Sequence, residues 1–453
     1  MLKVFLHDSD IGIIGCSGAT VLSTHGIALQ SEKRCGKIFL GNDQQLISWS
    51  EINENYQEVE AIDGFLIATQ YDIPWREDLF DSDDDTFGVS AQCIEFKRKG
   101  YKTVVINQMI PWILSKNDNF KVVLQAQKNF LNEYSSELFP KVLVIIPTYN
   151  RSQYFRVALD SVLNQTYRNL KIVISDDSTN EETENLMQPY LNKYSNITYF
   201  RNRGFNGDSN WNFLRKYQMD EDECEYVNWL MDDDIFFPRK IEIMVELFRN
   251  NPGVSLVTSP RGLMDVEGKI TPVYREGLFK IEGNEAGKLI FKKDNYIGEP
   301  TTALMKKSCL RNNDLCWNDD ENGFFSLVDV STWLSLLSRG DLIIYPESLS
   351  ATRTHDNRGS NQSETGILYC IDYAKEIWTA WEKKIFLKTE DDIYEALLIW
   401  FVRTTKVMLD AHEKNFKNEA LLSLLKEVFV ETVKAFSNGY EMKYKIKSRG
   451  VDF

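Results

Sequence analysis

We predict an α/β fold for this chain, with a parallel sheet in its central part and a run of helices at its end. Apolar runs typical of buried strands alternate with helical periods in the central part, as in LVIIPTYN, NLKIVISDDS and ITYFRN. Such alternation is typical of parallel α/β sheets. The last part carries apolar residues at helical spacing, for example Ile393, Leu397, Trp400 and Val407, which predicts helices with one apolar face.

The composition and the net charge of the chain argue against several classes of protein. The chain has 453 residues, enough for two or three domains, and its net charge of −15 argues against a nucleic-acid partner. Its seven cysteines form no CxxC pair, so we expect free thiols in a reducing compartment rather than a zinc motif or disulfides. The N-terminus is too charged for a signal peptide, and no apolar run approaches the ~20 residues of a membrane span. We therefore expect a soluble, cytoplasmic protein.

The pattern along the chain predicts four parts. Residues 1–112 contain strand-like runs such as DIGIIGCSGA and GYKTVVIN, with a helix around Val89 to Arg98. Residues 113–139 are polar and helix-prone and form a connector. We expect the α/β domain at residues 140–365 and the helical region at residues 366–453.

Polar residues stand where the predicted strands end. Asn150, Asp176 and Asp177 follow two of the apolar runs, and a third run, YVNWLMDDDIFFP, leads into Asp232 to Asp234. In parallel sheets, ligands bind beyond the carboxyl ends of the strands. Three adjacent carboxylates repel one another unless a cation neutralises them, and magnesium and manganese prefer oxygen ligands. The alternative for the three acids is an acidic surface turn.

The order and spacing of these motifs carry a resemblance to a known family. PTYNRSQYFRVALDSVLNQTYRNLKIVISDDSTNEET, followed by WLMDDDIFFP, resembles the family 2 glycosyltransferases, which have the GT-A fold, over roughly residues 140–360. The resemblance implies an inverting transfer of a sugar from a nucleotide diphosphate sugar, usually a UDP-sugar, to an acceptor glycan in bacterial-type polysaccharide or glycoconjugate synthesis. A non-catalytic scaffold that assists a partner transferase is the alternative. A nucleotidyltransferase would need a Gly-rich, basic phosphate loop, which the sequence lacks.

The resemblance assigns donor-binding roles to six residues. It implies a loop around the nucleoside, an acid that binds the nucleobase and another acid near the ribose. These residues are Pro147, Thr148, Tyr149 and Asn150 in the loop, Asp177 at the base and Asp232 at the ribose. For Asp176 and Asp177, capping of the next helix is the alternative, and Tyr149 could simply pack within its loop.

The resemblance also implies a manganese or magnesium cofactor. The family often has an acid where this chain has Met231, which leaves open which of Asp232 to Asp234 touches the ion. Asp233 is the favoured ligand and Asp234 the second. His355, in ATRTHDNRGS, stands where many relatives have an Arg-x-His whose histidine completes the metal shell. A loop histidine without function is the alternative. The ion would bridge the two phosphates of the donor and stabilise the leaving diphosphate.

An inverting transfer needs a carboxylate that takes the proton of the acceptor hydroxyl. GFFSLVDVSTWLSLLSRG resembles the family region that contains this base, which points to Asp329, although Val328 replaces the commoner Glu. Partial burial would raise the pKa of Asp329 and help it accept a proton. A helix N-cap is the alternative role, and Asp319 and Asp320 are weaker candidates for the base.

Further residues are expected around the donor sugar, the acceptor and the diphosphate. Glu299, in NYIGEPTTALMKKS, resembles a GEP segment of some relatives, with a structural turn as the alternative. Arg353 and Arg358 could meet the diphosphate.

The N-terminal part resembles the carboxyl-terminal half of a second glycosyltransferase-like domain, through IGIIGCSGA, VEAIDGFLIATQYDIPWREDLFD and FKRKGYKTVV. It has no PTYN-like loop, Asp83 to Asp85 lie in a polar segment, and Gly88 stands where an acid is expected. We therefore expect residues 1–112 to bind no nucleotide, as a degenerate remnant or as part of a longer domain, with Glu77 and Asp78 vestigial.

The expected partners are the nucleotide sugar and a glycan, a lipid-linked glycan or a glycoprotein. The apolar face of the C-terminal helices could pack on the chain's own domains or on a second copy. KYKIKSR, with Lys443, Lys445, Lys447 and Arg449, could also contact the inner face of a membrane, at ~1 kcal/mol for each basic residue near anionic lipid.

Overall fold

The structure is a computed structural model of the chain. It describes residues 1–41, 43–80, 85–115, 122–205, 207–310, 327–354, 363–414 and 416–440. Several residues singled out in the sequence lie outside these ranges: His355, Arg358, Asp319, Asp320, Asp83, Asp84 and the basic segment with Lys443, Lys445, Lys447 and Arg449.

The chain folds into two compact units. The finer division into four parts that the sequence indicates stays a prediction. The first unit comprises Met1–Pro140, Thr166–Asn169 and Val245–Pro252, and the second comprises Lys141–Gln165, Leu170–Met244 and Gly253–Phe453.

Short strands and three α-helices make up the described part of the first unit before residue 140. Its elements are α1 (Leu2–His7), β1 (Ile11–Gly15), β2 (Ser17–Ala19), η1 (Ala28–Gln30), β3 (Arg34–Leu40), β4 (Gln45–Ser48), β5 (Tyr56–Glu58), β6 (Ala61–Ile62), β7 (Ala68–Thr69), α2 (Asp85–Arg98), β8 (Lys102–Ile106), β9 (Leu114–Ser115) and α3 (Leu124–Leu138). One sheet has the order β5-β8-β1-β7 and the other β4-β3-β2-β6, with β9 paired to β3. All five residues of β1 are buried, as expected for a strand covered on both faces. Phe87 of α2 and Phe130 and Tyr134 of α3 pack in the core of this unit.

The second unit begins with the predicted alternation of strands and helices. Its elements, of which α7 ends in the first unit, are β10 (Val142–Thr148), α4 (Ser152–Leu163), β11 (Leu170–Asp176), α5 (Glu182–Lys193), β12 (Ile197–Arg201), α6 (Gly207–Asp220), β13 (Tyr226–Trp229), β14 (Ile235–Phe236), α7 (Lys240–Asn250), β15 (Val254–Thr258), β16 (Arg261–Met264), β17 (Ile270–Thr271), β18 (Phe279–Ile281), α8 (Gly283–Lys293), η2 (Pro300–Thr302), β19 (Leu304–Lys306), η3 (Lys307–Cys309), α9 (Val328–Leu337), β20 (Asp341–Ile344), β21 (Ser350–Arg353), α10 (Ser363–Glu382), α11 (Glu390–Glu413) and α12 (Glu419–Ser437). The strands at LVIIPTYN, NLKIVISDDS and ITYFRN are thus all present.

The main sheet of this unit positions the candidate site. Its strand order is β12-β11-β10-β13-β19-β15-β20-β18, and β10 pairs in parallel with β11 on one side and with β13 on the other. All seven residues of β10 are buried, which explains its continuous apolar run. From β10 the chain adds β11 and β12 on one side and then returns to place β13 on the other side, so the strand order reverses between β10 and β13. In such a sheet a ligand is expected beyond the carboxyl ends of the two strands at this point.

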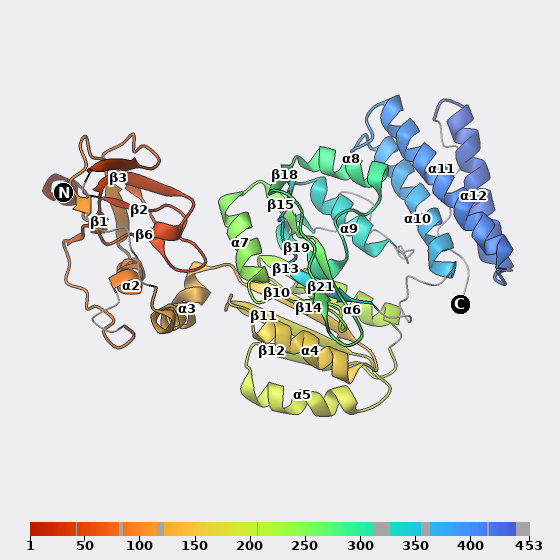
Figure 1. Cartoon of the computed structure of the whole chain (residues 1–453), viewed down its shortest axis with the longest axis horizontal. Helices are drawn as coiled ribbons and strands as arrows, with labels where there is room; N and C mark the ends of the chain where they lie inside the picture. Colours follow the sequence, from red (N-terminus) through yellow and green to blue (C-terminus); the bar gives the residue numbers. More distant parts are fainter. Residues whose placement is uncertain are drawn as a thin grey trace. The chain divides into compact units, whose positions relative to one another are not determined.

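Helices cover this sheet, and a small second sheet stands beside it. α4 and α5 lie together along one side of the main sheet (Figure 1), as right-handed crossovers in the same direction require. The second sheet has the order β14-β21-β16-β17. Because β14 follows the acids Asp232 to Asp234 directly, this sheet places the end of β21 next to them.

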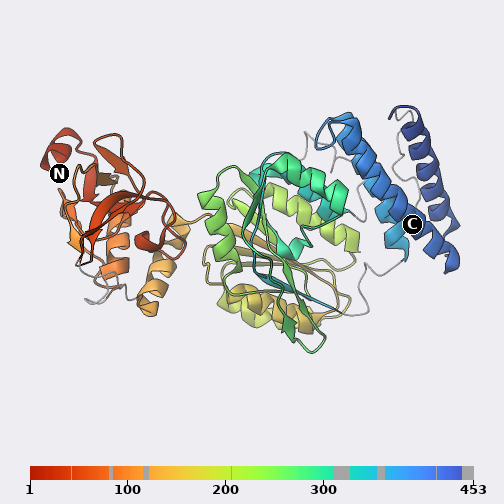
Figure 2. The same ribbon diagram turned by 45° about the horizontal axis from the view of Figure 1, so that its top comes forward.

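The C-terminal region is helical, as predicted. Helices α10, α11 and α12 pack side by side (Figures 1 and 2), and a capping box at Thr389 begins α11. Ile393, Leu397 and Trp400 are fully buried, and Val407 packs against the same core, so the apolar face that the sequence revealed is covered within the chain. Among the described helices, none combines the length and apolarity that a membrane crossing requires. The predicted fold class, α/β with a helical C-terminal region, is confirmed.

Candidate active site

The loop after β10 is tied to the loop after β11. Asn150 has a φ of 52°, in the left-handed region that Asn tolerates better than most residues. Its backbone N–H donates to the Ser178 hydroxyl at 2.8 Å, and its Oδ1 accepts from the Thr179 backbone N–H at 2.9 Å. Pro147 and Thr148 are buried at the end of β10, whereas Tyr149 is half exposed. The predicted nucleoside loop therefore has a fixed backbone and one aromatic ring open to solvent.

The two acids after β11 have different surroundings. Asp176 is fully buried and accepts hydrogen bonds from the Tyr199 hydroxyl at 2.6 Å and the Ser178 N–H at 2.8 Å. Asp177 accepts from Asn210 Nδ2 of α6 at 3.0 Å, and burial raises its pKa. Neither acid caps α5, whose N-cap residue is Glu181. Asp176 thus has structural contacts, and Asp177 stays the candidate residue for binding the nucleobase of the donor.

Asp232 is the first residue of the acid run, Asp232 to Asp234, and connects it to the predicted nucleoside loop, Pro147 to Asn150. Its Oδ2 accepts from the Thr148 hydroxyl at 3.0 Å and from the Tyr149 N–H at 3.4 Å. The Arg151 guanidinium lies 3.3 Å from Oδ1. Burial, and next to it the charge of Asp233, raises the pKa of Asp232 to about 6. The carboxyl ends of β10 and β13 therefore meet here, as the parallel sheet predicts.

Asp233 and Asp234 differ in what holds them. The Asp233 carboxylate pairs with Arg151 at 3.1 Å, and its side chain reaches the surface, with an exposed fraction of 14%. Asp234 is buried, and its carboxylate accepts from the Thr301 hydroxyl at 2.6 Å and from the Arg353 N–H at 3.2 Å. Asp234 thus joins the acid run to η2 and β21, while Asp233 is better placed to meet a ligand.

The fit of Asp232 to Asp234 to a divalent ion depends on how many protein ligands that ion needs. Within the described ranges, no group of three or more His, Cys, Asp or Glu side chains is arranged to hold a metal, and the predicted ligand His355 lies outside them. Magnesium, however, is usually held by one or two carboxylates together with substrate phosphates and water. Asp233 with one further ligand from this chain matches that smaller donor set.

Arg151 is a site residue to which the sequence reasoning assigned no role. It contacts both Asp232 and Asp233, at the start of α4. The signal in the sequence was an Arg directly after PTYN, in the loop that already pointed to the donor. A guanidinium at this place is suited to phosphate oxygens as well as to carboxylates.

The predicted base, Asp329, lies in the first turn of α9. It is mostly buried, and its carboxylate accepts from the Val330 N–H at 2.8 Å and from Asn295 Nδ2 at 2.9 Å. Burial raises its pKa to about 6, and the charge of Asp294 adds to the rise. It is not the N-cap residue of α9, which is Leu327. A carboxyl with this pKa is suited to accept a proton near neutral pH.

The loop between α8 and β19 carries Glu299 and connects the acid run to Asp329. At one end of the loop Asn295 donates to Asp329, and at the other end Thr301 donates to Asp234. Glu299 stands between them and pairs with Arg261, while its Oε2 has no hydrogen-bond partner in the part of the chain that the structure describes. This position agrees with a role near the donor sugar or acceptor, which stays a prediction.

Arg353 is buried at the end of β21. Its Nη1 donates to the backbone carbonyl of Asp265 at 2.9 Å, and its guanidinium lies 4.6 Å from the ring centre of Tyr154. These contacts hold the β16–β17 hairpin. A contact between Arg353 and the diphosphate stays a prediction.

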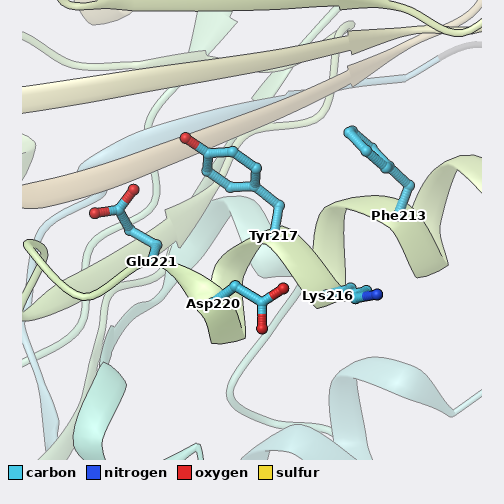
Figure 3. Close-up of a pocket in the computed structure, with 5 residues that line it drawn as sticks. All are labelled: Phe213, Lys216, Tyr217, Asp220 and Glu221. Atoms are coloured by element: carbon cyan, nitrogen blue, oxygen red, sulfur yellow. The ribbon is translucent and has the colours of Figure 1, made fainter.

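A shallow cavity of about 320 Å³ lies elsewhere, along α6 (Figure 3). It is lined by Phe213, Lys216, Tyr217, Asp220 and Glu221. Glu221 also pairs with Lys171, near the start of β11. The cavity is therefore near the amino end of that strand, whereas the candidate site is at the carboxyl ends.

Family models match both parts of the chain. Residues 143–313 match the model described as Glycosyl transferase family 2. The chain carries a family 2 glycosyltransferase domain. The matched range contains the nucleoside loop, Asp177, the acid run and Glu299, and it ends before Asp329. Residues 1–134 match the model described as Glycosyltransferase like family, so both resemblances that the sequence indicated are confirmed.

The curated relatives match only part of this chain, and only part of each relative is matched. An uncharacterized glycosyltransferase of Rickettsia felis is 41% identical over 110 residues, 24% of this chain and 17% of the relative. The GalNAc(5)-diNAcBac-PP-undecaprenol beta-1,3-glucosyltransferase of Campylobacter jejuni is 29% identical over 207 residues, 46% of this chain and 62% of the relative. The chain thus spans less than two thirds of the length of these curated relatives.

Solved glycosyltransferase structures are similar at low identity. TarS of S. aureus, residues 1–349 in complex with UDP-GlcNAc, is 15% identical with a TM-score of 0.41, covering 66% of this chain and 90% of that one. The mannosyltransferase PcManGT of Pyrobaculum calidifontis, in complex with GDP-Man and Mn2+, is 14% identical with a TM-score of 0.37, covering 68% of this chain and 85% of that one.

Proposed function

We propose that the chain is an inverting glycosyltransferase that moves a sugar from a nucleotide diphosphate sugar, a UDP-sugar, to an acceptor glycan. The observation that carries this proposal is one loop with Asn295 bound to Asp329 at one end and Thr301 bound to Asp234 at the other. The loop connects the acids proposed for the donor to the acid proposed as base. Both groups belong to one site in this proposal.

Donor binding is assigned to the carboxyl ends of β10, β11 and β13. Asp177 would hydrogen-bond the uracil, and Asp232 would lie near the ribose. Pro147, Thr148 and Asn150 would form the loop around the nucleoside, with the exposed Tyr149 ring available to stack on the base. The cross-link between Asn150 and Thr179 supports this assignment, because it holds the two loops that would face the nucleoside in one arrangement.

A manganese or magnesium ion is the proposed cofactor, with Asp233 as its first ligand and Asp234 or His355 as further ligands. When bound, the ion would stabilise the negative charge of the leaving diphosphate. Asp234 is the weaker ligand candidate of the two acids, because Thr301 and Arg353 already bind its carboxylate. Arg151 and Arg353 are the guanidinium groups proposed for the diphosphate oxygens.

Asp329 is the proposed general base. The acceptor hydroxyl would attack the anomeric carbon of the donor sugar and displace the nucleoside diphosphate, while the hydroxyl proton passes to Asp329. Because the attack comes from the side opposite the leaving group, a single displacement inverts the anomeric configuration. The raised pKa of Asp329 supports this role, since the carboxylate is ionised at neutral pH and still basic enough to take the proton.

The acceptor is proposed to be a glycan, free, lipid-linked or on a protein, in bacterial-type polysaccharide or glycoconjugate synthesis. A lipid-linked acceptor has the support of the Campylobacter jejuni relative, whose name specifies an undecaprenol-linked glycan. Such an acceptor would place the protein in the cytoplasm at the inner face of a membrane.

The test is a screen of UDP- and GDP-sugars by thermal shift with manganese, followed by measurement of nucleotide release from each donor that binds. We expect one UDP-sugar to raise the melting temperature and to be hydrolysed slowly without acceptor. Asp177→Asn should reduce binding of UDP itself. Binding of a donor with no release under any condition would favour the non-catalytic scaffold, and stabilisation by GDP-sugars alone would contradict the UDP assignment.

A further inference from the structure

The candidate base is held by a residue at the corner between α8 and the loop that follows it. Asp294 is the C-cap residue of α8 and has a φ of 69°, which is uncommon for a residue other than Gly. The next residue, Asn295, donates to Asp329 from Nδ2 and accepts from the Gly298 N–H through Oδ1, at 3.2 Å. The position of Asn295, and with it the orientation of the Asp329 carboxylate, therefore depends on the backbone at Asp294.

The C-terminal helices hold this corner. Arg403 of α11 forms a two-point ion pair with Asp294, with Nη1–Oδ1 at 3.0 Å and Nη2–Oδ2 at 2.5 Å. Tyr369 of α10 donates its hydroxyl to the same carboxylate. The guanidinium carbon of Arg403 lies 5.0 Å from the ring centre of Tyr369 and 5.6 Å from that of Tyr373. Such a stacked, two-point arrangement restricts the geometry far more than a single surface ion pair does.

A second contact joins the same helices to α9. Glu376 of α10 is fully buried and accepts a hydrogen bond from the Ser331 hydroxyl, two residues after Asp329. Burial raises the pKa of Glu376 well above its usual range. α10 thus contacts the segment that carries Asp329 as well as the corner that orients it.

We propose that Arg403 is a positioning residue for the reaction: with Tyr369 it fixes Asp294, and through Asn295 it keeps the Asp329 carboxylate oriented toward the acceptor hydroxyl. This inference rests on the proposed function, in which Asp329 is the base. It assigns the C-terminal helices a role in the chemistry of the glycosyltransferase domain, beyond completing its core.

The proposal has an electrostatic consequence. In the part of the chain that the structure describes, Asp294 is the ionisable group whose charge acts on Asp329. Arg403 and Tyr369 contact Asp294, Tyr373 lies beside Arg403, and Glu376 contacts Ser331. The negative charge of Asp294 raises the pKa of Asp329, and Arg403 neutralises that charge. Loss of Arg403 should therefore raise the pKa of the base, and loss of the Asp294 charge should lower it. Because Asp294 is partly exposed to water, which screens its charge, each shift should be small.

Hydrogen–deuterium exchange on the full-length protein tests the geometric link without requiring turnover. In Arg403→Gln, amides of residues 294–299 and 327–331 should exchange faster than in the unchanged protein. Lys288→Gln is the matched control, since Lys288 of α8 pairs with Asp392 of α11 across the same pair of helices but away from the corner. Unchanged exchange at residues 327–331 in Arg403→Gln, or equal effects of the two variants there, would overturn the proposal.

The pH dependence of donor hydrolysis tests the catalytic consequence, with the UDP-sugar found in the donor screen. Arg403→Gln should lower kcat roughly tenfold or more with the donor KM little changed, and it should shift the acid limb of the profile to higher pH. Asp294→Asn keeps a residue that tolerates the positive φ and should shift that limb to lower pH. Arg403→Lys, which keeps the charge, should restore the position of the limb but only part of kcat.

The outcomes separate this inference from the proposed function. If Asp329→Asn abolishes hydrolysis while Arg403→Gln and Asp294→Asn leave kcat and the acid limb unchanged, the proposed function stands and the positioning role is wrong. If the unchanged protein hydrolyses no donor, the proposed function fails, and the exchange experiment alone decides whether Arg403 holds the segment of Asp329.

Discussion

Asp329→Asn should make the protein more stable while it removes turnover. The pKa of Asp329 rises from 3.8 to about 6 on folding, which is about two units, and each unit corresponds to ~1.4 kcal/mol. The ionised carboxylate therefore costs the folded state up to roughly 3 kcal/mol at pH above that pKa. Asn carries no charge but loses one of the two hydrogen bonds that the carboxylate accepts, about 1 kcal/mol. The expected net gain at pH 8 is on the order of 1–2 kcal/mol.

The gain should depend on pH in a defined direction. The folded protein binds the Asp329 proton more tightly than the unfolded chain does, so stability from this group is present below the unfolded pKa of 3.8 and is lost as pH rises through about 6. The cost of the ionised carboxylate should be full at pH 8 and about half as large near pH 5. After the lost hydrogen bond is subtracted, the advantage of the Asn variant should fall from ~2 kcal/mol at pH 8 to roughly 0.5 kcal/mol near pH 5.

Calorimetric melting between about pH 5 and pH 8 measures this, with an expected rise in melting temperature of roughly 1–3 °C at pH 8. Asp410→Asn, the same change at an exposed position of α11, should leave the melting temperature unchanged. In parallel, turnover of Asp329→Asn should fall by a factor on the order of a hundred or more with donor binding retained. A lower melting temperature at pH 8, or a difference that does not vary with pH, would refute the burial argument. Unchanged turnover would point to Asp319, Asp320 or Glu299 instead.

Three further predictions address the donor site. Asp233→Asn should abolish transfer with the fold intact, and equal activity of the unchanged protein with and without manganese would contradict the metal assignment. Arg151→Gln should weaken binding of UDP roughly tenfold by calorimetry, because the guanidinium at the acid pair is lost; unchanged affinity would leave Arg151 with a structural role only. A chain that begins at Lys141 should still bind UDP, and loss of binding in a folded truncation would show that residues 1–140 contribute to the site.

Local pattern was enough to predict the elements and the side of the sheet on which the site lies. The apolar run that becomes β10 is buried at all seven positions, and helical period predicted helices between the strands of the central part and at the C-terminal end, where α4, α5, α11 and α12 lie. Residues that follow parallel strands must meet at one edge, which is why Thr148 and Asp232 could be expected together before their 3.0 Å contact was known.

Pairing between distant side chains could not be predicted in the same way. Asp234 and Arg353 are 119 residues apart, and their contact decides that the Asp234 carboxylate helps to hold β21. Nothing in the DDD run itself distinguishes Asp234 from Asp233, because the three acids are equivalent by type and spacing. Their difference comes from Thr301 and Arg151, which other loops bring to the site.

The sequence by itself determined the α/β class, the helical end, the resemblance to the family 2 glycosyltransferases and the acids at the strand ends. These follow from local periodicity and from motifs of adjacent residues. Only the tertiary structure decided which partner each acid has: Asn295 on Asp329, and Arg403 on Asp294 across 109 residues. Such contacts depend on how whole helices pack, and packing depends on the shape of many buried side chains at once, which no short segment encodes.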